Sequence, residues 1–363
     1  MINAELYERL FLYIIIIFTL ISCLLLNGLG YAAISKGSKN SQLALLLTIV
    51  FSLFIGFRPL SAAFGDSWVY NYTYELMKSN IGGAYETSSE WIWSEMMYFC
   101  SQTVDVSIFF TLVSLGYFGF TLLACKTLTP NNVLVSLLFC LGAFSFYTYA
   151  TNGIRNGLAC SILLYIIALC TKSVKRPIVI LLIFVVFNIH RSSLLPLASL
   201  FASIYVVKSY KWAYTFWLLS IIISLVAGGF ITSIFAGLGF DDRLSYLTST
   251  GDSHYTKTYF RWDFLIYSMM PIILGYYVVI KRGIQDKTYL ILLNTYTLAN
   301  AFWVMVIRAN YSNRFAYLSW FMYPLVLAYP LLKLNIWGNQ QGKRATQIML
   351  AHVGFTWFML TIF

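Results

Sequence analysis

Residues 10–32 read LFLYIIIIFTLISCLLLNGLGYA, an apolar run without a single charged side chain. A membrane hydrocarbon core is ~30 Å thick, and a helix needs about 20 apolar residues to cross it. In lipid the backbone must satisfy its own hydrogen bonds, which a helix does within one segment. This run therefore predicts a membrane-spanning helix, and the fold depends on how often such runs recur.

Runs of this kind fill most of the chain. Of its 363 residues, 60% are hydrophobic and 10% are charged, whereas soluble domains carry roughly 25% charged residues. The runs lack the alternation of membrane β-strands. The candidate spans are residues 10–32, 41–57, 106–125, 132–150, 155–171, 177–190, 192–207, 212–230, 264–280, 288–307, 315–332 and 345–362. We predict an all-α polytopic integral membrane protein with about 12 helices, in which residues 1–363 form one transmembrane domain.

The net charge of +11 is explained by the topology. Successive loops alternate between the two sides of the membrane, and the loops on one side hold 14 basic residues and a single acid, Asp286. The positive-inside rule makes that side cytoplasmic. The 14 basic residues are Lys36, Lys39, Lys126, Lys172, Lys175, Arg176, Lys208, Lys211, Lys281, Arg282, Lys287, Lys333, Lys343 and Arg344. Because the other side holds most acids, including Glu5 and Glu8, both termini are expected outside. No nucleic-acid partner is expected.

The basic residues of the outer side are mainly arginines. They are Arg9, Arg58, Arg155, Arg191, Arg243, Arg261, Arg308 and Arg314. A guanidinium differs from an ammonium group because its planar fork binds phosphate or carboxylate through two hydrogen bonds. Charges at the ends of apolar spans are usually functional. The alternative for any single arginine is that it reaches the lipid headgroups or pairs with an outer acid.

Two outer segments are long enough to have structure of their own. Residues 58–105 are predicted to hold two amphipathic helices at the membrane interface, Ser67–Met77 and Ser89–Phe99. Their aromatic residues suit an interfacial belt, and a sugar-stacking surface is the alternative. Residues 231–263 are predicted to form a mobile outer loop. It acts either as a lid over a cavity or as a plain connection.

Two short outer connections carry the clearest chemical signals. Arg155 falls in the first turn of a helix between Gly153 and Gly157, where free N–H groups and a guanidinium together suit an anion. His190 stands beside Arg191 between two apolar runs. Near neutral pH an imidazole exchanges protons, so His190 is a candidate base. The alternative is a hydrogen-bonded structural histidine.

A third connection supplies Arg308 and Arg314. If these two arginines converge with Arg155, Arg191 and Arg58 on one outer cavity, a multivalent anion is needed to offset their repulsion. The diphosphate of a lipid carrier fits that requirement, because its tail needs the bilayer and its charge needs arginines.

Asp66 follows the second span and is either a turn acid or a second candidate base. No group of His, Cys and acidic residues has the spacing of a metal site, and the cysteines are typical of packing residues. Neither a metal nor a cofactor is expected.

Several short motifs together resemble a known family. They are Phe57-Arg58-Pro59, Gly65-Asp66-Ser67 with Tyr70, Arg155-Asn156-Gly157-Leu158-Ala159, His190-Arg191-Ser192-Ser193 and Asn313-Arg314-Phe315. The chain resembles the EpsG branch of the Wzy-type polysaccharide polymerases, which make O-antigen, capsule or exopolysaccharide. Many relatives have His-Ser or His-Lys where this chain has His190-Arg191. The role of Arg191 is therefore less defined than that of His190.

The resemblance implies a GT-C-like membrane glycosyltransferase in the bacterial inner membrane. It would join repeat units carried on undecaprenyl diphosphate at the outer face, without a metal. Arg155, Arg308 and Arg314, with Arg58 and Arg191, would hold the diphosphate, and either His190 or Asp66 would be the base. The expected partners are the lipid-linked glycan, membrane lipid and a chain-length regulator protein. The rival functions are a flippase or transporter for the same glycans, an O-antigen ligase and a membrane acyltransferase.

The charge pattern gives a topology that can be tested. We expect both termini to face the exterior and the loop with Lys281, Arg282 and Lys287 to face the cytoplasm. A reporter enzyme that works only in the cytoplasm should be active when fused at Gln285. Activity there of a reporter that works only outside the cell would contradict this orientation.

Overall fold

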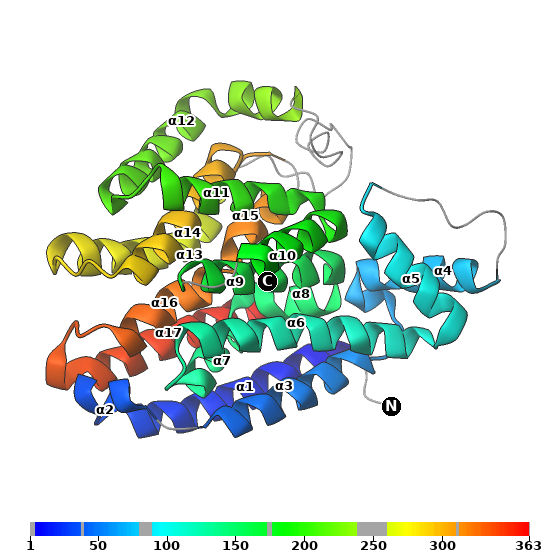
Figure 1. Cartoon of the computed structure of the whole chain (residues 1–363), viewed down its shortest axis with the longest axis horizontal. Helices are drawn as coiled ribbons and strands as arrows, with labels where there is room; N and C mark the ends of the chain where they lie inside the picture. Colours follow the sequence, from blue (N-terminus) through cyan, green and yellow to red (C-terminus); the bar gives the residue numbers. More distant parts are fainter. Residues whose placement is uncertain are drawn as a thin grey trace. The chain divides into compact units, whose positions relative to one another are not determined.

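The computed structural model describes residues 4–37, 40–79, 89–172, 176–237, 260–309 and 312–362. Within these ranges every regular element is a helix, which confirms the all-α prediction (Figure 1). The chain divides into two compact units. The first unit is Met1–Arg191 together with Ala328–Phe363, and the second is Ser192–Leu327.

The first unit contains most of the helices. They are α1 (Ala4–Leu26), α2 (Tyr31–Lys36), α3 (Ser41–Gly56), η1 (Ala62–Phe64), α4 (Asp66–Ser79), α5 (Trp91–Thr103), α6 (Val106–Leu128), α7 (Val133–Leu141), α8 (Phe144–Thr151), α9 (Ile154–Cys170), α10 (Arg176–Ile189), η5 (Gly338–Gln340) and α17 (Gln341–Ile362). The second unit contains α11 (Leu194–Tyr205), α12 (Tyr210–Gly237), α13 (Trp262–Gly275), the π-helical η4 (Tyr276–Lys281), α14 (Lys287–Met305) and α15 (Ser312–Trp320). Two further elements, η2 (Arg191–Ser193) and α16 (Tyr323–Lys333), cross from one unit to the other.

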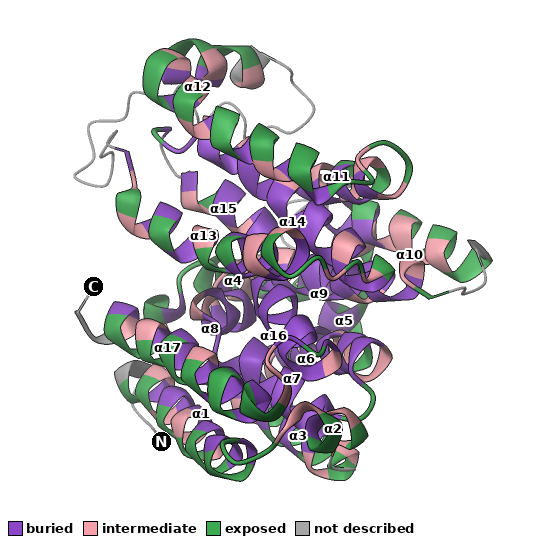
Figure 2. Ribbon diagram, turned by 90° about the vertical axis from the view of Figure 1, so that its left-hand side faces the viewer, coloured by how far each residue is buried: buried purple, intermediate pink, exposed green. Residues whose placement is uncertain are grey.

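The core of the first unit is built around α6 and α9. Helix α6 packs against both α3 and α9, and α10 packs against α9. Most residues of α9 are buried, as the ribbon coloured by burial shows (Figure 2). A helix that is apolar on all sides belongs inside a protein or a bilayer, and the run of Ile and Leu in α9 meets that description. This packing fixes the N-terminal end of α9, where Arg155 lies.

Every predicted span coincides with a helix or with two successive helices. Among the described residues, 5 helices are long and apolar enough to cross a membrane, or up to 6 if the bent pair α7 and α8 counts as one span. The helices of that pair meet at an angle of 74°. Some other expected spans are short: α9 has 17 residues, a length of roughly 25 Å. The chain is thus an integral membrane protein, and the count of about 12 crossings stays a prediction.

The structure describes one of the two predicted outer segments well and leaves most of the other undescribed. In residues 58–105 the two predicted helices are confirmed as α4 and α5, which pack against each other. Their position at a membrane interface stays a prediction. In residues 231–263, α12 extends to Gly237 and α13 begins at Trp262. The predicted mobile loop between them falls mostly on residues 238–259, which lie outside the described part of the chain.

Gly157 allows α8 and α9 to approach each other closely. A Cβ atom at this position would lie 2.5 Å from the carbonyl oxygen of Tyr149, a distance that a real Cβ does not tolerate. The oxygen belongs to the backbone of α8, so it cannot move aside as a flexible side chain would. Gly157 is therefore required by the hairpin that places the first turn of α9.

We expect Gly157→Ala to lower the free energy of unfolding by about 1 to 3 kcal/mol, the usual cost of overpacking. Gly119→Ala is the matched control, because Gly119 also lies inside a helix but has no atom within 4 Å of an added Cβ. Alanine raises the intrinsic helix preference equally in both variants. The difference between their free energies of unfolding therefore reports the clash with Tyr149. Thermal midpoints in detergent measure it, and equal midpoints for the two variants would refute the close approach.

Candidate functional site

Three helix ends meet around the carboxylate of Glu90. Glu90 directly precedes α5, Arg155 lies in the first turn of α9, and His190 directly follows α10. Helix α10 packs against both α5 and α9. All three residues belong to the first unit. The packing of apolar helices therefore brings together side chains that are far apart in sequence.

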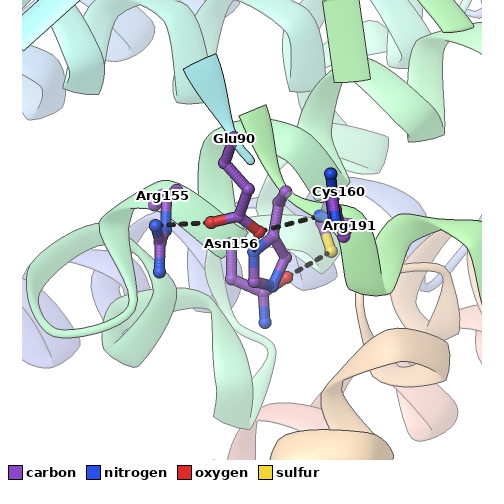
Figure 3. A network of polar contacts seen from close by, with 6 residues as sticks. Glu90, Arg155, Asn156, Cys160 and Arg191 are labelled. Atoms are coloured by element: carbon purple, nitrogen blue, oxygen red, sulfur yellow. Dashed lines mark hydrogen bonds and ion pairs between the residues drawn. The ribbon is translucent and has the colours of Figure 1, made fainter. Parts of the chain in front are cut away.

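The carboxylate of Glu90 uses both of its oxygens (Figure 3). Its Oε2 lies 2.5 Å from Nη1 of Arg155. Its Oε1 lies 3.2 Å from Nδ1 of His190 and accepts a hydrogen bond of 2.9 Å from the backbone N–H of Arg191. The group is enclosed, since the exposed fractions of the side chains are 10% for Glu90, 4% for His190 and 23% for Arg155. We call Glu90, Arg155 and His190 the Glu90 cluster.

The electrostatics of the cluster keep Glu90 ionised. Burial on its own raises the pKa of Glu90, because a carboxylate loses hydration. The hydrogen bond with His190, the charge of Arg155 and the N–H of Arg191 outweigh burial and lower the pKa to about 2. Glu90 is thus an anion at any physiological pH. It does not serve as a proton acceptor near neutrality, which leaves that role to another residue.

Two guanidinium donors, one within the cluster and one beside it, have no acceptor among the described residues. They are Nε of Arg155 and Nε of Arg191, and both atoms are buried. Buried polar groups in proteins are nearly always hydrogen-bonded to protein or water. Arg155 can therefore hold Glu90 through Nη1 and still offer Nε to an oxygen of a ligand. Such an arrangement suits a phosphate or a sugar oxygen.

Asn156 lies next to Arg155 in the first turn of α9. Its side-chain oxygen lies 3.2 Å from the sulfur of Cys160, one turn further along the same helix, and the thiol donates to it (Figure 3). This contact orients the amide of Asn156. Cys160, which the sequence marks only as a packing residue, is buried and also supports the polar first turn of α9.

Arg58 is buried and bonded to protein. Its Nη1 donates to the carbonyl of Ile55 at 2.9 Å, and its Nη2 donates to the carbonyl of Thr151 at 3.2 Å and to the hydroxyl of Ser67. The guanidinium also lies 4.6 Å from the centroid of the Phe110 ring. These contacts join the ends of α3 and α8 to the start of α4. Diphosphate binding by Arg58 stays a prediction.

Asp66 is the first residue of α4 and is exposed. Its backbone N–H donates to the side-chain oxygen of Asn152 at 2.8 Å, and Gly65 before it has a φ of 55° that forms the turn. No hydrogen bond or ion pair of the Asp66 carboxylate occurs within the described ranges. The structure anchors this residue to the connection between α8 and α9, whereas His190 has a carboxylate partner. The role of Asp66 as a base stays a prediction.

Arg308 and Arg314 belong to the second unit, and both are exposed. The guanidinium of Arg308 lies 5.7 Å from the centroid of the Phe260 ring. Arg314 lies on α15. Because the predicted convergence of five arginines combines both units, it stays a prediction.

The structure thus brings Arg155, His190 and Arg191 together around Glu90, while their roles in binding and catalysis stay predictions. Sequence reasoning had no means to select Glu90 from the other acids of residues 58–105. Its only distinguishing mark is its place directly before a helix. Among the described residues, no three His, Cys, Asp or Glu side chains form a group that could hold a metal ion.

Comparison with known proteins agrees with the motifs quoted above. The model of the EpsG family matches residues 42–361 of this chain, which is most of its 363 residues. Neither the curated proteins nor the solved structures contain a match. The matched range includes Glu90, Arg155 and His190. The chain therefore belongs to the EpsG family, an exopolysaccharide and polysaccharide polymerase-like family of membrane proteins.

Proposed function

We propose that this protein is a glycosyltransferase that joins oligosaccharide repeat units carried on undecaprenyl diphosphate. The reaction takes place at the outer face of the bacterial inner membrane. The observation that supports it best is the Glu90 cluster, in which an imidazole and a guanidinium meet in an enclosed site. One group suits proton removal from a sugar hydroxyl, and the other suits an anionic leaving group.

The proposed reaction is a substitution at the anomeric carbon of the donor glycan. A hydroxyl oxygen of the acceptor repeat unit forms a bond to that carbon. The bond between the carbon and the diphosphate oxygen breaks, and its electron pair leaves with the lipid diphosphate. His190 accepts the hydroxyl proton. The leaving group is a stable anion, so it needs charge stabilisation more than protonation.

Arginines supply that stabilisation in this proposal. Arg155 offers its unpaired Nε to a phosphate oxygen, at the N-terminal end of α9 where the helix dipole also favours an anion. Arg191 offers its own buried Nε. Arg308 and Arg314, which are exposed cations of the second unit, remain proposed ligands of diphosphate oxygens. The role of Arg58 is proposed as structural, because its guanidinium already has protein partners.

His190 is the preferred base for a physical reason. Its ring contacts an ionised carboxylate, which stabilises the imidazolium that forms when the proton arrives. Asp66 is exposed and would receive a proton without such support. It remains the second candidate base.

One observation favours a second candidate function. The bent pair α7 and α8 is a broken span or a re-entrant loop, and broken helices are common at the substrate sites of transporters. A flippase for the same lipid-linked glycans would use such a break. The two functions differ in what accumulates when the protein fails. A failed polymerase leaves single repeat units at the outer face, and a failed flippase leaves them at the inner face.

We expect Arg155→Lys to lose most polymer formation while the protein still inserts in the membrane. Lysine keeps the positive charge but cannot hold Glu90 and a phosphate oxygen through separate nitrogens. Losing one such contact in a transition state costs about 10² to 10³ in rate. Gel analysis of surface polysaccharide, at matched protein levels, measures the result. Lys281→Ala, in an expected cytoplasmic loop, is the control and should polymerise like the parent.

We expect His190→Ala to abolish polymerisation and to leave binding of the lipid-linked glycan nearly unchanged. Removing a proton acceptor affects the transition state and hardly affects the ground state. Single repeat units should then remain at the outer face in place of a ladder of long chains. Polymer of normal length from both His190→Ala and Arg155→Lys would show that the reaction does not occur at the Glu90 cluster.

A further inference from the structure

Resting on the proposed function, we propose that Glu90 is a positioning residue that holds a proton on Nδ1 of His190 and ties this imidazole to Arg155. Glu90 does not touch the reacting atoms in this proposal. It acts through His190, by setting which ring nitrogen carries the lone pair that accepts the proton of the sugar hydroxyl. Glu90 therefore determines whether His190 can act as the base.

The first step of the argument concerns hydrogen-bond chemistry. An ionised carboxylate only accepts hydrogen bonds. Oε1 of Glu90 lies 3.2 Å from Nδ1 of His190, so Nδ1 must be the donor. A neutral imidazole carries one proton. With that proton on Nδ1, the lone pair is on Nε2, and Nε2 is the nitrogen that can act as a base.

The second step concerns how firmly the carboxylate is placed. The same Oε1 accepts the backbone N–H of Arg191 at 2.9 Å, and Oε2 is held by Nη1 of Arg155 at 2.5 Å. The carboxylate is thus fixed from two sides, by α9 and by the segment that follows α10. His190 is almost fully enclosed. The ring consequently keeps one orientation toward Glu90.

The third step separates this role from helix capping. Glu90 occupies the N-cap position of α5, where a carboxylate would ordinarily accept hydrogen bonds from the first turn. No such side-chain bond is made at the start of α5. The carboxylate points instead to residues of other helices (Figure 3). The contacts of the carboxylate with Arg155, His190 and Arg191 all reach residues outside α5.

Glu90→Gln is the variant that tests this inference. Glutamine keeps the shape, but its NH₂ group can donate to Nδ1 and thereby move the proton of the imidazole to Nε2. The wrong tautomer of a base costs a large part of the rate, on the order of 10² to 10⁴. We expect polymer formation to fall by at least about 10²-fold, with membrane insertion unchanged.

The tautomer can be observed without any activity. The chain has 3 histidines, so ¹⁵N-histidine labelling gives a spectrum simple enough to assign, with His190→Ala identifying the signal of His190. The parent is expected to show Nδ1–H, and Glu90→Gln is expected to show more Nε2–H. A parent protein with its proton on Nε2 would overturn the inference even if Glu90→Gln proved too unstable to purify. Glu90→Asp should keep the Nδ1–H tautomer, since it remains a pure acceptor.

The position of the proton on His190 separates positioning from a general structural role. A variant that only disturbs the fold would lower polymer formation without moving that proton from Nδ1 to Nε2, whereas loss of positioning changes both. Glu75→Gln, an exposed acid on α4, is the control and should behave like the parent. Normal polymer from His190→Ala would refute the proposed function itself. Loss of polymer in His190→Ala, combined with an unchanged rate and tautomer in Glu90→Gln, would refute only the role of Glu90.

Discussion

The enclosed ion pair between Glu90 and Arg155 is the interaction on which the rest of this site depends. Burying a charge without a partner is costly, so the buried carboxylate of Glu90 requires a cation such as Arg155. Because Glu90 stands before α5 and Arg155 opens α9, the pair fixes two helix ends against each other. His190 enters the same arrangement from the end of α10. One carboxylate therefore joins the ends of three helices that apolar packing has brought together.

The end of α8 and its connection to α9 help to hold the Glu90 cluster in place. The Thr151 carbonyl accepts a hydrogen bond from Arg58, and the Asn152 side chain accepts one from the backbone of Asp66. Gly157 permits the close approach of the two helices. A change at Arg58 would thus act on Arg155 through the backbone between α8 and α9, without any contact with a substrate. Arg58 can thus influence the site through its contacts with protein alone.

The sequence predicts the helices well because a bilayer leaves an apolar run few alternatives. It does not reveal the break between α7 and α8, since residues 132–150 form one continuous apolar run. It places Arg155 and His190 at helix ends, where their flanking residues single them out. It misses Glu90, whose contact with His190 spans 100 positions of the chain. No local pattern marks a pairing at that separation, because the three-dimensional packing of α5, α9 and α10 creates it.

The pairing also gives a physical reason for arginine at position 155. In the proposed function Arg155 and Arg191 bind the same diphosphate, and two cations close together repel each other. Glu90 removes part of that repulsion, because its carboxylate pairs with Arg155. A guanidinium can keep this partner on Nη1 and still present Nε to a second anion, since its donors lie on separate nitrogens in one plane. A lysine ammonium gathers its donors on a single atom, so it would have to share that atom between Glu90 and a phosphate. Under the proposed function, the residue at position 155 binds two anions at once, and arginine suits that role better than lysine.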